Sequence, residues 1–384
     1  MHNGQFFYLP FSLLKNIGYL FKRLNKYPTL ALSNKRLFVI SKMKKVSLKD
    51  VAQRASVSTA LVSYVINNRL EERINKETAE RVRKAVRELG YQPNRIAQSL
   101  KLQRTLTLGF IVPDIANTFS SCLARLIEDA ASKNRYTLLI GSSDEKEEKQ
   151  QALIDLFLNR QVDGLIIGAA EGTERQLEAL LLNKMPVVLI DRYFPSLPID
   201  GTIIDNYGAS LNAIEHLIRQ GRKKIAIVAY DTQMFHLQER VRGYRDTMHK
   251  NQLAVDNQWI GKVATGQAEV QTPEIIEQFF AGDNTPDAVF FISNSLAVAG
   301  LKKLVAMNIY IPDQLAVVAF DETEAFDLFD SPVTFIRQPL DLLARNAVNC
   351  ILNRIQHPEG AVQLRQFPTE LVIRKSSTPS TRTV

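Results

Sequence analysis

Short polar side chains stand directly after several apolar segments of this chain, and such groups can hydrogen-bond a hydroxylated small molecule. Each apolar segment has the length and composition of a buried strand. In open parallel sheets a ligand binds outside the carboxyl ends of the strands, so these positions predict one binding cleft. For two of them, Asp191 and Asp205, capping a helix or tying a loop is an alternative role. The residues are Asp114, Asp191, Arg192, Asp205, Asn206, Asn294 and Asp321.

Motifs for catalysis, phosphate binding and metal binding are absent from the sequence. It contains no G-x-S-x-G, no P-loop and no G-x-G-x-x-G after a strand. Cys122 and Cys350 lie far apart without a C-x-x-C motif, which argues against a disulfide framework and favours a reducing compartment such as the cytoplasm. We therefore expect neither an enzyme nor a metal or cofactor. The histidines have no metal-ligand spacing; they are His2, His216, His236, His249 and His357.

From residue 105 onward, apolar runs alternate with helical segments, which is typical of doubly wound parallel sheets. Two such series follow one another, so we expect an α/β body over residues 105–376 with two subdomains. The first is predicted to take about 105–204 plus 338–366, and the second about 205–337 plus 367–376. The expected strands lie in TLTLGFIVPD, YTLLIGSS, VDGLIIGAA, PVVLIDR, GTIIDN, KKIAIVAY, QWIGKVA, PDAVFFISN, QLAVVAFDE and VTFIRQP.

A small all-α domain is expected before this body, over residues 44–90. Ser47 and Ser58 are placed to cap two short helices, and a third helix begins at Asn75 and ends at Gly90. Two short helices braced by a third form a helix-turn-helix, whose second helix enters the major groove of DNA. A three-helix bundle that never touches DNA is the alternative. The outer face of the second helix carries Thr59, Ala60, Ser63 and Tyr64.

The charge distribution favours the DNA-binding alternative. Residues 1–104 carry 21 Lys and Arg against 6 Asp and Glu, whereas residues 105–384 carry 27 against 34. A basic domain on an acidic body is expected when one end of the chain meets a polyanion such as DNA.

The stretch SLKDVAQRASVSTALVSYVINN, together with INKETAERVRKAVRELGYQPNRIAQSLK, is similar to the DNA-binding domain and hinge of the LacI family of bacterial transcriptional regulators. The resemblance continues to about Lys375. It implies a homodimer on a near-palindromic operator, a body shaped like periplasmic sugar-binding proteins and a sugar-like effector. It also implies DNA contacts at Ser58, Thr59, Ala60, Ser63, Tyr64, Asn67, Arg95 and Leu100.

Residues 91–104 are predicted to form a hinge. The segment NRIAQSLK gives about two helical turns, too short to be stable alone in water. The resemblance implies that it folds against its symmetry mate in the minor groove, where Leu100 wedges between base steps and kinks the duplex. An ordinary linker leucine is the alternative reading of Leu100.

The resemblance also adds to the candidate cleft. Arg240, in RVRGYRD, matches a family arginine that reaches the effector, and Phe119, in ANTFS, matches a pocket aromatic. Asn294 departs from the usual Asp, and the positions of a stacking aromatic and a polar contact fall near Thr265 and Met234. We therefore name no effector beyond the family default of a sugar or sugar derivative. The predicted effector contacts are Asp114, Phe119, Arg192, Arg240, Asn294 and Asp321.

The two ends of the chain are expected to lie outside the fold. Residues 1–43 form a basic leader without acidic residues, and residues 377–384 form a tail. Three readings of the leader compete: a sequence upstream of a start at Met43, which we favour, a basic appendage that touches DNA or a membrane, and a part of the fold. The basic residues interrupt every apolar run, so no membrane anchor is expected.

Three classes of protein remain to be weighed. An enzyme has no motif in its favour. A free-standing sugar-binding protein would explain the body, but not the basic domain and hinge before it. A cytoplasmic, sequence-specific DNA-binding regulator, most often a repressor, accounts for both parts of the chain.

Overall fold

The chain forms two compact units, Met1–Gln98 and Ser99–Val384. The division falls within the predicted hinge, residues 91–104. The computed structural model describes residues 30–33, 36–39, 46–67, 73–91 and 104–378. Most of the predicted leader and hinge, including Arg95 and Leu100, lies outside the described residues.

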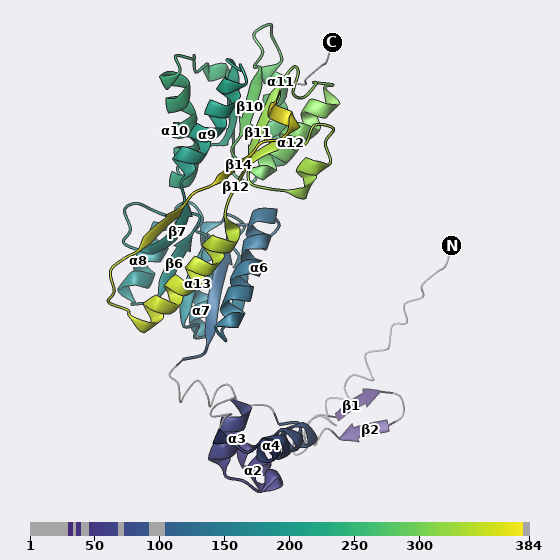
Figure 1. Cartoon of the computed structure of the whole chain (residues 1–384), viewed down its shortest axis with the longest axis vertical. Coiled ribbons are helices and arrows are strands. Elements are labelled where there is room, and N and C mark those ends of the chain that lie inside the picture. The colour runs from purple at the N-terminus through teal and green to yellow at the C-terminus, as the bar shows by residue number, and fades with distance from the viewer. Residues whose placement is uncertain (1–29, 34–35, 40–45, 68–72, 92–103, 379–384) are drawn as a thin grey trace, which may run out of the picture. The chain divides into compact units, whose positions relative to one another are not determined.

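The first unit contains three helices, whose ends are capped as the sequence predicts, and a two-stranded sheet. Ser47 and Asp50 form a capping box, and the Ser58 hydroxyl accepts a hydrogen bond from the Leu61 amide at 3.2 Å. The last helix ends at Gly90 with φ of +61°, a left-handed conformation that favours glycine. The elements are the antiparallel strands β1 (Leu30–Ser33) and β2 (Arg36–Val39), followed by α2 (Leu48–Ala55), α3 (Thr59–Ile66) and α4 (Lys76–Leu89) (Figure 1).

A small apolar core holds these three helices together. Its centre is fully buried, with Val51, Val62 and Val82 contributed by α2, α3 and α4 in turn. The three helices are each too short to be stable alone, so this shared core fixes their arrangement. We call residues 46–67 and 73–91 the head.

The second unit consists of two lobes, each built on a six-stranded sheet. The first lobe has the strand order β13-β7-β6-β5-β3-β4, and all of these neighbours are parallel. Helices α6 and α13 lie side by side on this lobe (Figure 1). Its elements are β3 (Thr107–Val112), α6 (Thr118–Lys133), β4 (Thr137–Ser142), α7 (Glu147–Asn159), β5 (Gly164–Ile167), α8 (Glu174–Leu182), β6 (Val187–Ile190), β7 (Asp200–Ile204), α13 (Leu340–Gln356) and β13 (Leu364–Phe367).

The second lobe repeats this plan with the strand order β14-β12-β11-β10-β8-β9. Neighbouring strands of this sheet are parallel, except that β14 runs antiparallel to β12. Its elements are α9 (Asn206–Arg219), β8 (Ile225–Tyr230), α10 (Phe235–Lys250), η2 (Asn257–Trp259), β9 (Ile260–Val263), α11 (Ala268–Phe279), β10 (Ala288–Phe291), α12 (Asn294–Ala306), β11 (Ala316–Phe320), η3 (Glu324–Asp327), β12 (Thr334–Arg337), β14 (Glu370–Val372) and η4 (Lys375–Ser377).

The predicted fold class is confirmed: a helix-turn-helix precedes two parallel-sheet α/β lobes. All ten segments predicted as strands contain strands, β3 to β12. The chain passes between the lobes three times, after β7, after β12 and after β13. Strands β13 and β14 were not expected, because they lie at sheet edges and are largely exposed and so carry no buried apolar run.

A buried cluster of hydroxyl groups ties the end of the chain to the second lobe. Ser377, the first residue of the predicted tail, is fully buried, so the folded body extends at least to this residue. Its hydroxyl lies 2.7 Å from His216 Nε2 and 2.6 Å from Thr334 Oγ1. The Ser376 hydroxyl accepts from the Thr334 amide and donates to the Val317 carbonyl, both at 2.7 Å.

Replacing Ser376→Ala should therefore destabilise the second unit. The change leaves the buried Thr334 amide and Val317 carbonyl without these partners, which costs about 1–3 kcal/mol. Urea unfolding followed by circular dichroism measures the loss. The exposed Ser196→Ala is the matched control and should change stability by less than about 0.5 kcal/mol; equal stability of the two variants would contradict the role given to Ser376.

Candidate functional site

The head presents one face of α3 to solvent. Ser58, Thr59, Ala60 and Tyr64 are exposed, with 40% of Tyr64 accessible, because the opposite side of α3 packs on the core through Val62 and Val65. These polar and small side chains are thus placed as the sequence predicts for a recognition helix.

Ser63 and Asn67 are placed differently from these four residues. Ser63 is half-buried, and the Asn67 side-chain amide donates to the Ser63 carbonyl at 2.7 Å and to its hydroxyl at 3.3 Å. This bonding closes the end of α3. Asn67 therefore has a local structural role in addition to the DNA contact predicted for it.

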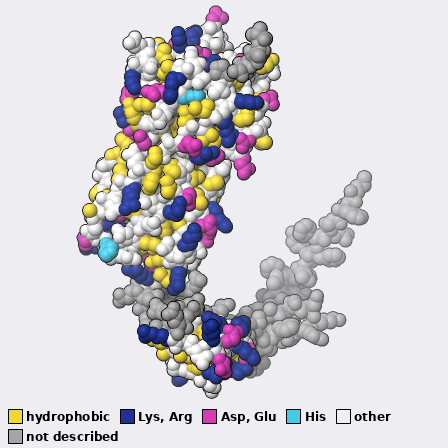
Figure 2. Space-filling model, in the orientation of Figure 1, with side chains coloured by type: hydrophobic (Ala, Val, Ile, Leu, Met, Phe, Trp, Pro, Cys, Tyr) yellow, Lys and Arg dark blue, Asp and Glu magenta, His cyan; other side chains and the backbone are white. Residues whose placement is uncertain are grey.

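Basic side chains cover the surface of the head. The head contains eight Lys and Arg against four Asp and Glu, and all twelve are exposed. Some of the basic residues have acidic neighbours within the head; for example, Arg54 and Lys84 pair with Glu88, and Arg87 pairs with Glu80. Figure 2 shows Lys and Arg side chains on the visible side of this unit. A surface of this kind suits phosphate contacts.

A cleft of about 1220 Å³ opens between the two lobes of the second unit. It is lined by residues that follow β3, β6, β10, β11 and β12, where each strand reaches its carboxyl end. All six residues predicted to contact an effector line it: Asp114, Phe119, Arg192, Arg240, Asn294 and Asp321.

Two buried carboxylates occupy equivalent positions in the two lobes. Asp191 follows β6 and Asp321 follows β11, each is 8% exposed, and each has a left-handed φ, of +65° and +68°. The Asp191 amide donates to the Thr202 carbonyl of β7, and the Asp321 amide donates to the Ile336 carbonyl of β12. The same backbone turn, at the end of the equivalent strand in each lobe, therefore directs both carboxylates into the cleft.

Arg240 is buried at the floor of the second lobe, with 3% of the residue exposed. Its Nε donates to Asn206 Oδ1 at 2.8 Å, and its Nη1 donates to the Ile292 carbonyl at 2.7 Å. The guanidinium carbon lies 3.4 Å from the centre of the Phe320 ring, an arrangement that favours a cation–π interaction. These contacts fix the cation next to Asp321.

Burial and charge together shift the proton affinities in the cleft. Burial raises the pKa of Asp321 to about 6, against the attraction of Arg240, and burial likewise raises the pKa of Asp191. Burial, reinforced by repulsion from Arg192 and Arg240, holds the pKa of His236 well below its usual range. His236 is therefore neutral at pH 7.

Several buried polar atoms at the cleft have no hydrogen-bond partner among the described residues. They are Asp191 Oδ1, Gln338 Oε1, His236 Nδ1 and Arg192 Nε. The equivalent carboxylate of the second lobe has a partner, because Gln338 Nε2 donates to Asp321 Oδ1 at 2.7 Å. An unpaired buried polar group is costly, so a ligand that bonds these atoms gains that free energy on binding.

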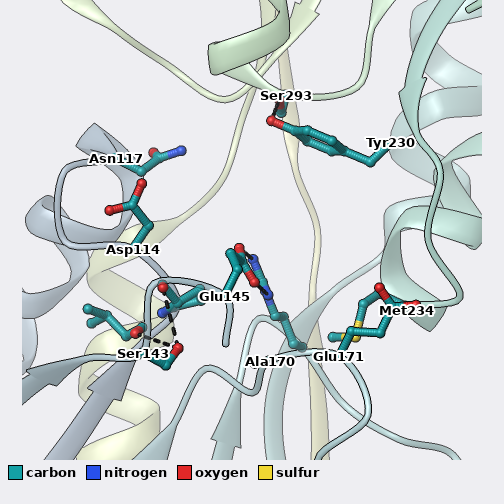
Figure 3. Close-up of polar contacts among 12 residues, drawn as sticks. Asp114, Asn117, Ser143, Glu145, Ala170, Glu171, Tyr230, Met234 and Ser293 are labelled. Carbon is teal, nitrogen blue, oxygen red and sulfur yellow. Dashed lines mark hydrogen bonds and ion pairs between the residues drawn. The ribbon is translucent and has the colours of Figure 1, made fainter. Parts of the chain in front are cut away.

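Arg192 is already engaged by a carboxylate of its own lobe. Glu145 accepts from Arg192 Nη2 at 2.6 Å and from Nη1 at 2.7 Å, and Nη1 also donates to the Ala169 carbonyl at 3.1 Å. The pair is mostly buried, with side-chain exposures of 14% and 26%. Figure 3 shows Glu145 reaching toward the middle of the cleft from the loop that carries Ser143.

Two groups of hydrogen bonds connect the lobes across the cleft. Asn117, the N-cap of α6, exchanges bonds of 3.2 Å with Asn294 and donates to the Ser295 hydroxyl at 3.3 Å. Glu171 accepts from the Thr232 hydroxyl at 2.7 Å. Figure 3 places Asn117 and Glu171 on different sides of the cleft.

The cleft contains residues that the strand-end pattern missed or left open. Asp205 caps α9 by accepting from the Gly208 amide at 2.8 Å, whereas Asp191 faces the cleft.

Gln338 and Tyr230 stand at the ends of β12 and β8 and could have been found by the same rule. The rule could not have found His236 and Glu145, since neither ends a strand. The lining residues that the sequence analysis missed include Asn117, Glu145, Tyr230, His236, Ser293 and Gln338. Thr265 and Met234 also line it.

Within the described part of the chain, no helix is long and apolar enough to span a membrane. The same residues hold no group of three or more His, Cys, Asp or Glu placed to bind a metal ion.

Two family models match the chain. The model for bacterial regulatory proteins of the lacI family matches residues 47–94, and the model for a periplasmic binding protein-like domain matches residues 214–377. The first range covers the head helices and the second lies within the two-lobed unit.

Solved structures with this fold include the lac repressor dimer bound to operator and the anti-inducer ONPF. It has a TM-score of 0.75 and 24% identity, covering 88% of this chain and all of that one. A complex of the transcriptional regulator CelR with cellobiose has a TM-score of 0.63 and 24% identity, covering 86% of this chain and 99% of that one.

Curated relatives match over nearly their whole length. The HTH-type transcriptional repressor CytR of Escherichia coli (strain K12) is 31% identical over 333 residues, which cover 86% of this chain and 96% of CytR. The HTH-type transcriptional repressor PurR of Vibrio campbellii is 31% identical over 332 residues, covering 86% and 98%. These relatives are regulators of transcription rather than enzymes. The chain therefore belongs to the LacI family of bacterial DNA-binding transcriptional regulators.

Proposed function

We propose that this protein is a cytoplasmic transcriptional repressor that binds a near-palindromic operator as a homodimer and responds to a small polyhydroxylated effector in its cleft. The observation that carries the proposal is that one chain joins an exposed, basic recognition-helix face to a cleft lined by buried polar atoms without partners. The first feature suits DNA, and the second suits a small ligand.

The homodimer follows from the size of one recognition helix. Helix α3 spans Thr59–Ile66 and can read a single half-site, so two copies related by a two-fold axis would read the two halves of a palindrome. The names of CytR and PurR, both HTH-type transcriptional repressors, support repression as the mode of action.

The polar atoms of the cleft favour a ligand with several hydroxyl groups. Asp191, Asp321 and Gln338 present oxygen acceptors, and Tyr230 and Phe119 add aromatic surface against which a ring can pack. CelR, which shares the fold, is described in complex with cellobiose. A sugar or sugar derivative is accordingly the effector class that we propose, in contact with the six predicted residues.

Effector and operator would be coupled through the relative position of the lobes. The ligand contacts both lobes, so it stabilises the arrangement in which its contacts are best and shifts the protein between states of different operator affinity. For the segments outside the described residues we keep the predicted roles: residues 91–104 as a hinge that folds on DNA, Arg95 as a DNA contact and Leu100 as a minor-groove wedge.

Tyr64→Ala should change which operator sequence is preferred, because Tyr64 lies on the exposed face of α3. Loss of one base contact costs about 1–3 kcal/mol at the preferred site. Selection of binding sites from random DNA measures the preference. Lys76→Ala, on the exposed surface of α4, is the control and should weaken all sequences alike. An unaltered preference for Tyr64→Ala would refute this assignment.

Asp321→Ala should raise the effector concentration that shifts operator binding by about tenfold or more. A hydrogen bond to a charged group contributes about 1.5–3 kcal/mol, which corresponds to that change in affinity. Operator binding titrated with candidate sugars measures it. Asp330→Asn, at an exposed position of the same lobe, should respond as the wild type does. A normal response of Asp321→Ala would place the effector elsewhere.

Stability should fall as pH rises from about 4 to about 6. The usual pKa of Asp321 is 3.8, and burial raises it to about 6 in the folded chain. Between these values the folded state keeps a proton that the unfolded state has lost, so raising the pH favours unfolding. Asp321→Asn cannot lose this proton and should flatten the slope of the urea midpoint against pH; a slope equal to that of the wild type would show that Asp321 does not titrate in this way.

A further inference from the structure

The charges around the cleft point to the kind of effector that it excludes. Six acidic and four basic side chains line the cleft, and three of the acidic ones, Glu145, Asp191 and Asp321, lie near the two arginines at its floor. A phosphate or carboxylate ligand needs a guanidinium or ammonium group with free N–H donors. The other two basic residues, Lys302 and Lys303, lie on α12; Lys302 is exposed and Lys303 pairs with Glu277. The question at the buried floor is therefore whether Arg192 or Arg240 has such donors to offer.

Arg192 has both of its Nη groups engaged. Glu145 binds them at 2.6 and 2.7 Å in the bidentate arrangement that an anionic ligand would otherwise adopt. The Ala169 carbonyl takes a further bond from Nη1 at 3.1 Å, which leaves Nε as the unpaired donor. Glu145 thus occupies the position of an anion within the binding site.

Glu145 is held in this position by the backbone of its loop. Asp144 and Glu145 both have left-handed φ values, of +50° and +57°, and the Glu145 amide donates to the Pro113 carbonyl at 2.9 Å. Two successive residues in this region are unfavourable unless other contacts compensate. The ion pair with Arg192 and the amide bond provide such contacts.

Arg240 is a poorer anion site than a free guanidinium, because two of its three nitrogens are engaged. Its Nε and Nη1 are bonded to Asn206 and to the Ile292 carbonyl, and one face of its guanidinium lies on the Phe320 ring. Among the charged groups around Arg240, Asp321 and Asp191 have the largest electrostatic effects on its guanidinium, and both attract it. A ligand anion would have to approach between these two buried carboxylates, which would repel it.

The unpaired atoms of the cleft are mostly acceptors. Gln338 Oε1 can only accept, Asp191 Oδ1 accepts when the carboxylate is ionised, and His236 Nδ1 accepts in one of the two neutral tautomers. Each of these three residues is more than nine-tenths buried. A ligand that satisfies them must bring hydroxyl or amine hydrogens.

We propose that Glu145 is a specificity-determining residue: it occupies both terminal nitrogens of Arg192 with an internal carboxylate, so that the cleft accepts neutral or cationic ligands rich in hydrogen-bond donors and disfavours phosphorylated and carboxylated ones. This inference rests on the proposed function, in which the cleft is the effector site, and it narrows the class of effector.

The test measures whether removing the charge of Glu145 creates a site for inorganic phosphate. The full chain is titrated with phosphate at constant ionic strength, with chloride as the balancing salt, and binding is followed by calorimetry and by melting temperature. The wild type should show no saturable binding. Glu145→Gln should bind phosphate saturably, at least about tenfold more tightly than the detection limit of the wild-type titration, as expected when one charge-assisted bidentate contact becomes available.

Two further variants assign the effect. Glu148→Gln removes the same charge at an exposed position nearby and should behave as the wild type. Glu145→Gln combined with Arg192→Gln should lose the gained binding, because the phosphate then lacks its guanidinium. Glu145→Ala is a second charge-removing variant in case Glu145→Gln does not fold, which circular dichroism would detect.

Phosphate binding to the wild type as tight as to the Glu145 variants would overturn the proposal. So would no gain in a folded Glu145 variant, or a gain that persists without Arg192. None of these readings involves DNA, so they are separate from a failure of the proposed function, which would appear as a normal operator response in Asp321→Ala.

Discussion

The buried guanidinium group of Arg240 determines how several elements of the second lobe are aligned at the cleft. A cation that is 3% exposed is tolerated only when its donors are bonded and its charge is balanced. Asn206 at the start of α9, the Ile292 carbonyl after β10 and the Phe320 ring at the end of β11 provide these contacts. Because the three groups come from separate elements, satisfying one side chain aligns the ends of all three and places Asp321 at the cleft.

The two lobes balance their cleft arginines in different ways, although their backbones repeat one plan. Asp191 and Asp321 end equivalent strands with nearly the same φ, so the backbone provides a matched pair of carboxylates. In the second lobe the cation is held mainly by neutral groups and remains attracted to both carboxylates. In the first lobe Glu145 neutralises Arg192 directly. The two lobes therefore have similar backbones but different distributions of charge at the cleft. A ligand between them must match both distributions.

The sequence predicts most of this architecture because it depends on local patterns. Apolar runs identify β3 to β12, caps identify the head helices, and the strand-end rule brings Arg192 and Asp321 to one cleft. It misses β13 and β14, short edge strands without a fully buried residue. It also misses Glu145, since a left-handed loop residue 47 positions before Arg192 shows no periodicity that would reveal the pair. Contacts made by long-range pairing carry little signal in a single sequence.

The hydrogen bonds that join the lobes across the cleft bear on the proposed coupling between effector and lobe position. Asn117 with Asn294 and Glu171 with Thr232 join uncharged or singly charged groups that are not fully buried. Each such bond contributes only about 1 kcal/mol net, up to about 3 where a charge takes part. Under the proposed function, breaking or forming such a bond changes the balance between lobe positions by an amount that one ligand's differential affinity can supply. Apolar contacts also join the lobes, because Met234 is buried in the core of the first lobe and Phe235 packs edge-on against Tyr193, with 5.2 Å between the ring centres. A change in the position of the lobes must keep or repack these contacts.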